Sequence, residues 1–156
     1  MIAIGGMDMI IDGVVEQGKH LGRTLGFPTA NVRPIEAAGD WPRNGVYIAA
    51  IWLNGARRAW LCMLNQGVHP TVPEGKPTIE AHVLGYEGDV YGLPVRVEYL
   101  SFLRPERKFD SVEALRAQLS KDRAATAAWL EEALTAGDPD GAQSRARAIE
   151  WETGAR

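Results

Sequence analysis

Short runs of β-favouring residues fill the first two thirds of the chain. In these runs apolar residues alternate with polar ones or form brief apolar stretches, and turns rich in glycine, proline or asparagine separate them. One such turn, Asn54-Gly55, is a strong signal for a tight β-hairpin. The predicted strands span residues 9–16, 45–53, 59–65, 78–84 and 93–103. Five or six short strands at this spacing indicate an antiparallel barrel or sandwich.

The last third of the chain changes to a helical period. Apolar residues recur at helical spacing from 112 to 119 and, more weakly, to 134. Asp110 and Glu113 form a capping box for this run, and the Gly-Asp-Pro turn at 137–139 ends it. We therefore expect one C-terminal helix whose apolar stripe packs on the strands. The sequence divides into a barrel-plus-helix domain over 1–135 and a C-terminal tail or short helix over 136–156.

Length and charge limit the partners of this domain. A chain of 156 residues fits one domain with a real core. Seventeen Lys and Arg stand against 20 Asp and Glu, and a net charge of −3 gives no general attraction to nucleic acid or to an anionic membrane. No apolar stretch approaches the ~20 residues that cross a bilayer. We therefore expect no nucleic acid and no membrane among its partners, and we expect a monomer.

The single cysteine indicates the compartment. Cys62 cannot form an intramolecular disulfide, and its neighbours at 59–64 are apolar, as expected for a buried structural thiol. The N-terminal residues 1–11 lack the basic region of a signal peptide. The sequence therefore predicts a cytoplasmic protein in a reducing environment.

The segment richest in chemical information is 22–31, Gly-Arg-Thr-Leu-Gly-Phe-Pro-Thr-Ala-Asn. Its glycines let the backbone approach a ligand closely, and Pro28 fixes the turn that presents Thr29 and Asn31. Their hydroxyl and amide carbonyl are hard oxygen ligands of the kind that Mg²⁺ accepts beside a nucleotide phosphate. Taken alone, the segment also fits an ordinary glycine-rich turn that enters a strand.

Two further segments carry ionisable groups. Glu80 stands among alternating apolar residues, where a carboxylate facing a closed site could act as a general base toward a hydroxyl. A solvated side chain or half of an ion pair is the alternative. Residues 104–109 place three cations before the predicted helix, and they fit either a solvated charged turn or an arginine plane stacked on an aromatic ligand. The three histidines match no zinc spacing.

These segments, in this order and spacing, resemble the riboflavin kinase (flavokinase) family, in particular the kinase module of bacterial bifunctional riboflavin kinase/FMN adenylyltransferases. The family shows a Leu-Gly-Phe-Pro-Thr-Ala-Asn run, a Gly-Val-Tyr strand, a Gly-x-x-Pro-Thr turn, a Glu-x-His strand and an Arg-Pro-Glu-x-Lys-Phe segment before a helix. Here these motifs stand at 25–31, 45–47, 67–71, 80–82 and 104–109. The resemblance implies a mainly β fold, a six-stranded antiparallel Greek-key barrel with a C-terminal α-helix.

The resemblance also implies a reaction and the residues that perform it. Such kinases transfer the γ-phosphate of ATP to the ribityl 5′-hydroxyl of riboflavin and give FMN, with Mg²⁺ on the nucleotide. Glu80 matches the catalytic base, and Thr29 and Asn31 match the pair that holds the metal. Arg104 and Phe109 match residues that bind the flavin, on the flavin side of the site. The implied nucleotide-binding residues are Gly13, Gly18, Lys19, Gly22, Arg23, Gly26, Pro28, Thr29 and Asn31.

The sequence also departs from the family pattern. In bacteria the kinase module usually follows an FMN adenylyltransferase domain, which is absent here, so we expect FMN but not FAD from this chain and a separate adenylyltransferase for the next step. Gln66 stands where the family more often has isoleucine, which leaves the fit around the ligand open. The alternative to an active kinase is a flavin-binding sensor or interaction module. Retention of Glu80 favours the enzyme, because a binder has little need for a base there.

Overall fold

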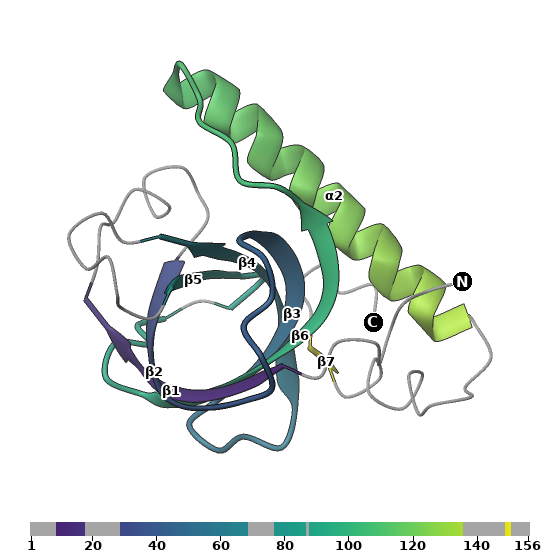
Figure 1. The fold of residues 1–156 in the computed structure, drawn as a ribbon. Helices are drawn as coiled ribbons and strands as arrows, with labels where there is room; N and C mark the ends of the chain where they lie inside the picture. The colour runs from purple at the N-terminus through teal and green to yellow at the C-terminus, as the bar shows by residue number, and fades with distance from the viewer. Residues whose placement is uncertain (1–8, 18–28, 69–76, 87, 136–148, 151–156) are drawn as a thin grey trace.

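Strands and one long helix make up most of the described chain (Figure 1). The computed structural model describes residues 9–17, 29–68, 77–86, 88–135 and 149–150. The elements are β1 (Ile10–Glu16), β2 (Thr29–Ala38), β3 (Gly45–Leu53), β4 (Ala59–Gly67), β5 (Thr78–Val83), β6 (Pro94–Arg104), α2 (Val112–Thr135) and β7 (Ile149–Glu150). The bounds of each predicted strand differ by at most two residues from those of an observed strand. The hydrophobic pattern did not single out β2.

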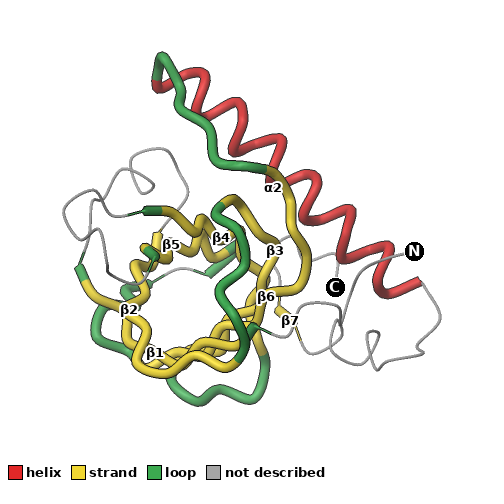
Figure 2. The backbone as a smooth tube through the Cα atoms, viewed as in Figure 1, coloured by secondary structure: helices red, strands yellow, loops and turns green. Residues whose placement is uncertain are grey.

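The first six strands close into a barrel. Their order is β3-β6-β1-β2-β5-β4, and β4 pairs back onto β3, with every neighbouring pair antiparallel. Closure leaves these strands without open sheet edges. The chain joins adjacent strands at β1–β2, β3–β4 and β4–β5, but joins non-adjacent strands at β2–β3 and β5–β6. Figure 2 shows the ring of strands with α2 outside it. The predicted six-stranded antiparallel barrel with a C-terminal helix is confirmed.

The interior of the barrel follows from the alternation of side chains along each strand. Tyr47 and Tyr99 are the largest side chains of this interior, and their ring centroids lie 4.9 Å apart. The buried members of the interior cluster are Met9, Ile11, Val15, Ala30, Val32, Tyr47, Ala49, Ile51, Leu53, Cys62, Leu64, Ile79, Ala81, Val83, Val95, Val97 and Tyr99. The residues that alternate with these along each strand face the outside of the barrel.

Helix α2 packs on the outside of the barrel (Figure 1). Leu119, Leu130 and Ala133 of the helix join a second buried apolar cluster with residues of β3, β4 and β6. The N–H of Ala114 donates to the hydroxyl of Ser111 at 3.0 Å, so Ser111 caps the helix. The predicted cap, Asp110, is therefore wrong by one residue, because it lies one position too early to reach this N–H.

Two backbone sites depend on particular residues. Asn54 and Gly55 have φ angles of 52° and 73°, the positive values that a two-residue hairpin turn requires, which confirms the predicted hairpin. Gly13 faces Pro34 where the register of β1 against β2 shifts. A Cβ on Gly13 would clash with the carbonyl oxygen of Arg33, and the same bulge accommodates a proline inside β2.

Strand β7 lies within the predicted C-terminal tail. It pairs in parallel with the start of β4, Ile149 beside Ala59 and Glu150 beside Trp60. Residues 136–148 and 151–156 lie outside the described part of the chain. Among the described residues, the helix is not apolar enough over a sufficient length to cross a membrane.

Candidate active site

A row of three polar residues crosses the outer face of the barrel. Asn31 of β2 is the register partner of Glu80 on β5, and Glu80 is also the partner of Asn65 on β4. All three side chains are half-buried. Their strand neighbours Ala30, Ala81 and Leu64 belong to the barrel interior, so the row faces outward. Cross-strand partners have Cβ atoms ~5 Å apart, which places a carboxylate between two amides.

A second row lies beside the first. Thr29 is the register partner of His82, and the hydroxyl oxygen of Thr29 lies 3.2 Å from Nδ1 of the His82 ring. His82 stands two residues after Glu80, on the same face of β5. The two rows therefore bring Thr29, Asn31 and Glu80 together, although Glu80 is about 50 residues away along the chain from the other two.

The donor atoms of this patch suit a hard divalent cation. Thr29 offers a hydroxyl, Asn31 an amide carbonyl and Glu80 a carboxylate, which are the oxygen ligands that Mg²⁺ prefers. Within the described residues, no group of three or more His, Cys, Asp or Glu is placed to hold a metal ion by itself. The patch therefore fits a cation that arrives with an oxygen-rich ligand such as a nucleotide phosphate.

Gly13 stands apart from these rows. It lies on β1 at the bulge opposite Pro34, and its lack of a side chain is explained there by the close approach of the Arg33 carbonyl. Asn31 pairs instead with Glu16 at the far end of β1. The nucleotide role of Gly13 stays a prediction. Gly18, Lys19, Gly22, Arg23, Gly26 and Pro28 lie outside the described residues.

Arg104 and Phe109 lie near each other at the end of β6. The guanidinium carbon of Arg104 stands 5.8 Å from the centroid of the Phe109 ring. The charge of Arg104 is compensated by Asp122 of α2, whose carboxylate accepts from Nη2 of Arg104 at 2.8 Å. The sequence did not identify Asp122, because its partner is 18 positions away and on another element.

Gln66 belongs to the barrel interior and not to an open ligand surface. Its side chain is 1% exposed. The hydroxyl of Tyr99 donates to Oε1 of Gln66 at 2.7 Å, and Nε2 of Gln66 donates to the carbonyl of Pro42 at 2.7 Å and to Oδ1 of Asn44 at 3.2 Å. Gln66, which departs from the family pattern, therefore has hydrogen-bond partners within the fold for both ends of its side-chain amide.

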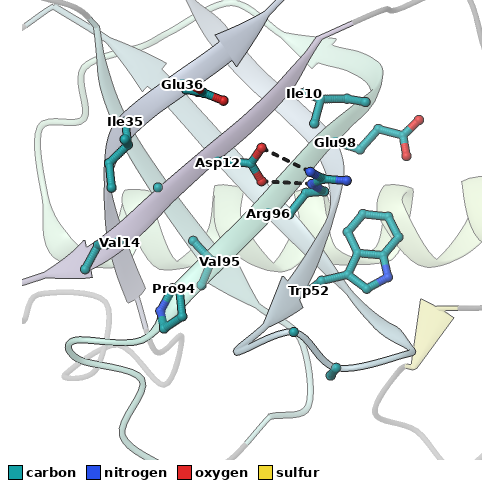
Figure 3. Close-up of a pocket in the computed structure, with 13 residues that line it drawn as sticks. Ile10, Asp12, Val14, Ile35, Glu36, Trp52, Pro94, Val95, Arg96 and Glu98 are labelled. Carbon is teal, nitrogen blue, oxygen red and sulfur yellow. Dashed lines mark hydrogen bonds and ion pairs between the residues drawn. The ribbon is translucent and has the colours of Figure 1, made fainter.

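A separate groove of about 720 Å³ lies on the outer face of β1, β2 and β6 (Figure 3). Two hydrogen bonds join Arg96 to Asp12 across it, at 2.8 and 3.1 Å, and they hold the pKa of Asp12 below its usual value. Trp52 and the exposed Ile35 supply apolar surface. Of the described residues assigned to the site from sequence, Gly13 lines this groove, whereas Glu80 and Asn31 do not.

Comparison with known proteins identifies relatives of this chain. The chain is 41% identical over 123 residues to an RNA-binding riboflavin kinase of Bacillus subtilis, which covers 78% of this chain and 51% of that protein. It is 36% identical over 121 residues to the bifunctional riboflavin kinase/FMN adenylyltransferase of the same organism, covering 76% and 37%. The corresponding Escherichia coli K12 protein is 36% identical over 117 residues, covering 75% and 36%. The chain thus spans about half or less of these relatives.

Solved structures and a family model complete the comparison. The fold resembles a macrolide-efflux protein from Streptococcus pneumoniae with a TM-score of 0.64 at 30% identity, covering 77% of this chain and 38% of that one. It resembles the riboflavin kinase of Trypanosoma brucei with a TM-score of 0.57, covering 89% and 85%, a likeness of fold at 22% identity. The model of the riboflavin kinase family matches residues 6–130, most of the sequence. The chain therefore belongs to the riboflavin kinase family.

Proposed function

We propose that this protein transfers the γ-phosphate of ATP to the ribityl 5′-hydroxyl of riboflavin and releases FMN. The observation that carries the proposal is the outward-facing row of Asn31, Glu80 and Asn65 in a chain of the riboflavin kinase family. Phosphoryl transfer depends on positioning and charge neutralisation more than on covalent chemistry of the protein. One base beside a set of oxygen ligands is therefore sufficient for this reaction.

Glu80 is the general base in this proposal. Its carboxylate takes the proton of the ribityl hydroxyl as the hydroxyl oxygen attacks the γ-phosphorus, while the bond from that phosphorus to the β,γ-bridging oxygen breaks and ADP leaves. Two β-ladders fix the backbone of Glu80, because β5 pairs with β2 on one side and with β4 on the other. A base on a rigid strand keeps its position relative to the ligands across the row.

Thr29 and Asn31 form the nucleotide end of the site. Their oxygen atoms suit Mg²⁺ bound to ATP, whose charge offsets that of the phosphates. The glycine-rich residues 18–28 precede this pair in the sequence and carry Lys19 and Arg23. In this proposal that segment covers the phosphates, with backbone N–H groups and two cations as its contribution.

Arg104 and Phe109 form the flavin side. Phe109 is an aromatic surface of the kind on which a planar ring stacks, and the cations of Arg104 and Arg107 lie 5.8 and 5.0 Å from its centroid. A separate FMN adenylyltransferase is the partner that we propose for the step from FMN to FAD.

Product analysis tests the proposal directly. The purified protein is incubated with riboflavin, ATP and Mg²⁺, and the flavins are separated by chromatography and detected by fluorescence. We expect FMN only when both ATP and Mg²⁺ are present, and no FAD. Riboflavin binding without FMN would contradict the proposal and favour the alternative, a flavin-binding sensor that keeps the fold without turnover.

We also propose that nucleic acid is not a partner of this protein. It rests on the net charge of −3, which gives no general attraction to a phosphate backbone. The relative named an RNA-binding riboflavin kinase makes this prediction worth testing. We expect no shift of a labelled RNA by the protein at physiological salt, and a salt-sensitive shift would overturn the prediction.

A further inference from the structure

A buried ion pair ties the end of β6 to helix α2. Nε of Arg104 donates to both carboxylate oxygens of Asp122, at 2.9 and 3.1 Å, and Nη2 donates to Oδ2 at 2.8 Å. The Asp122 side chain is 3% exposed and that of Arg104 is 18% exposed. Bidentate pairs of this kind are strong and directional, so Asp122 fixes the plane of the guanidinium.

The ion pair belongs to a wider hydrogen-bond network. Nε2 of Gln118, one turn before Asp122 on α2, donates to Oδ1 of Asp122 at 2.9 Å. Oε1 of Gln118 accepts from Nη1 of Arg107 at 3.1 Å, and Nη1 of Arg104 donates to the carbonyl of Pro105 at 3.1 Å. The helix therefore holds this segment at Arg104 and Arg107. The guanidinium carbons of these two arginines lie 5.8 and 5.0 Å from the centroid of the Phe109 ring.

The same segment also contacts the strands of the proposed site. A Cβ on Gly67 would lie 2.5 Å from a carboxylate oxygen of Glu106, so Glu106 stands directly against the end of β4. Gly67 is the register partner of Thr78, which begins β5 two residues before Glu80. Residues 104–109 thus run from the helix network to the edge of the surface that carries the base.

We propose that Asp122 is a positioning residue for riboflavin, acting through Arg104 on residues 104–109. This inference rests on the proposed kinase function. The four hydrogen bonds of Arg104 go to Asp122 and Pro105, so Arg104 serves the flavin side by holding Phe109 and its segment in position. The function of Asp122 is to set the flavin side at a fixed distance from Glu80.

A measurement without substrate tests the structural half of this proposal. Asp122→Asn keeps the size of the side chain but removes its charge, and hydrogen exchange reports on the amides of residues 104–110. We expect exchange there to quicken by about tenfold, while β1 and β2 keep their protection. Glu131→Gln is the matched control, because Glu131 is an exposed carboxylate of the same helix. Unchanged exchange at 104–110 in Asp122→Asn would overturn the proposal.

Steady-state kinetics tests the functional half. We expect Asp122→Asn to raise the KM for riboflavin by about tenfold, while the KM for ATP stays within about twofold and kcat within about threefold. Arg104→Gln should have the same effect, and the double variant should show no further increase. An additional rise in the double variant would mean that Arg104 contacts the flavin directly, and equal rises in both KM values would mean a general loss of structure; either result overturns the proposal.

Two provisions keep the test decisive. Loss of a buried partner can unfold a small domain, so Gln118→Ala serves as a milder variant that releases Asp122 and Arg107 without leaving a charge unpaired. It should shift the riboflavin KM and the exchange of 104–110 in the same direction, and no shift in either would overturn the proposal. If the unmodified protein makes no FMN, the kinase function fails, while hydrogen exchange still decides whether Asp122 positions the segment.

Discussion

Asn31 and Glu80 are direct partners across the ladder between β2 and β5, and both face away from the barrel interior. This relationship joins the two motifs that the sequence linked only by resemblance. It places an oxygen donor suited to Mg²⁺ beside a carboxylate suited to accept a proton.

Replacement of the proposed base should separate binding from turnover. We expect Glu80→Gln to lower kcat by ~10²–10⁴, the usual contribution of a general base, with little change in riboflavin affinity. Fluorescence titration measures the affinity, and chromatography of FMN measures turnover. Glu36→Gln, an exposed carboxylate of β2 outside the polar rows, is the control. Turnover at the unmodified rate would remove Glu80 from this role.

The proposed metal pair should show itself in the Mg²⁺ dependence. We expect Asn31→Ala to raise the Mg²⁺ concentration for half-maximal activity by about 10–100-fold, as disturbance of a metal site commonly does. Asn31→Asp keeps an oxygen ligand at the same position and should retain most of the affinity. Activity titrated with Mg²⁺ at fixed ATP gives the comparison. Equal behaviour of the two variants would contradict a metal role for Asn31.

The buried contact between Gln66 and Tyr99 should matter for stability. Gln66→Leu leaves the Tyr99 hydroxyl without its acceptor inside the barrel, and we expect the free energy of unfolding to fall by ~1–3 kcal/mol. Urea denaturation measures the loss. Tyr99→Phe in the same background should cost less than it does alone, because the hydroxyl no longer has its partner. Strictly additive losses would argue against the coupling.

The position on β1 opposite the bulge of β2 should tolerate only glycine. A Cβ at position 13 would meet the backbone carbonyl of Arg33, which cannot rotate away as a side chain could. We expect Gly13→Ala to lower the free energy of unfolding by ~1–3 kcal/mol, the range for overpacking. Urea denaturation without ATP provides the measurement. A variant as stable as the unmodified protein would mean that the bulge relaxes, and would leave ligand binding as the reason for this glycine.

Alkaline pH should destabilise the fold through two interior groups. Burial raises the pKa of the Cys62 thiol and of the Tyr99 hydroxyl, so the folded state disfavours their ionised forms. Their contribution to stability is present below the unfolded thiol pKa of ~8.5 and is lost as the pH rises above it. We expect the urea midpoint to hold steady from about pH 7 to 8 and to fall above about pH 9. Cys62→Ala should make this fall shallower, and a midpoint independent of pH would refute the expectation.

Much of the fold could be predicted from local sequence. The strands and the hairpin at Asn54-Gly55 follow from side-chain alternation and from turn residues that accept positive φ, both of which act over a few neighbouring positions. Strand β2 did not stand out, because Arg33, Pro34 and Glu36 interrupt the pattern. The bulge opposite Gly13 makes that proline acceptable, and a bulge is a property of two paired strands.

The sequence by itself determined five of the strands, the helix, the family resemblance and the residue types that suit phosphoryl transfer. Tertiary structure alone decided which of those residues meet. Closure of the barrel sets β5 between β2 and β4 and so brings Asn65 to Glu80, a neighbour that the motifs did not indicate. Packing of α2 on the barrel places Asp122 where its carboxylate accepts hydrogen bonds from Arg104. Both outcomes depend on contacts between distant segments, which local propensity and spacing do not encode.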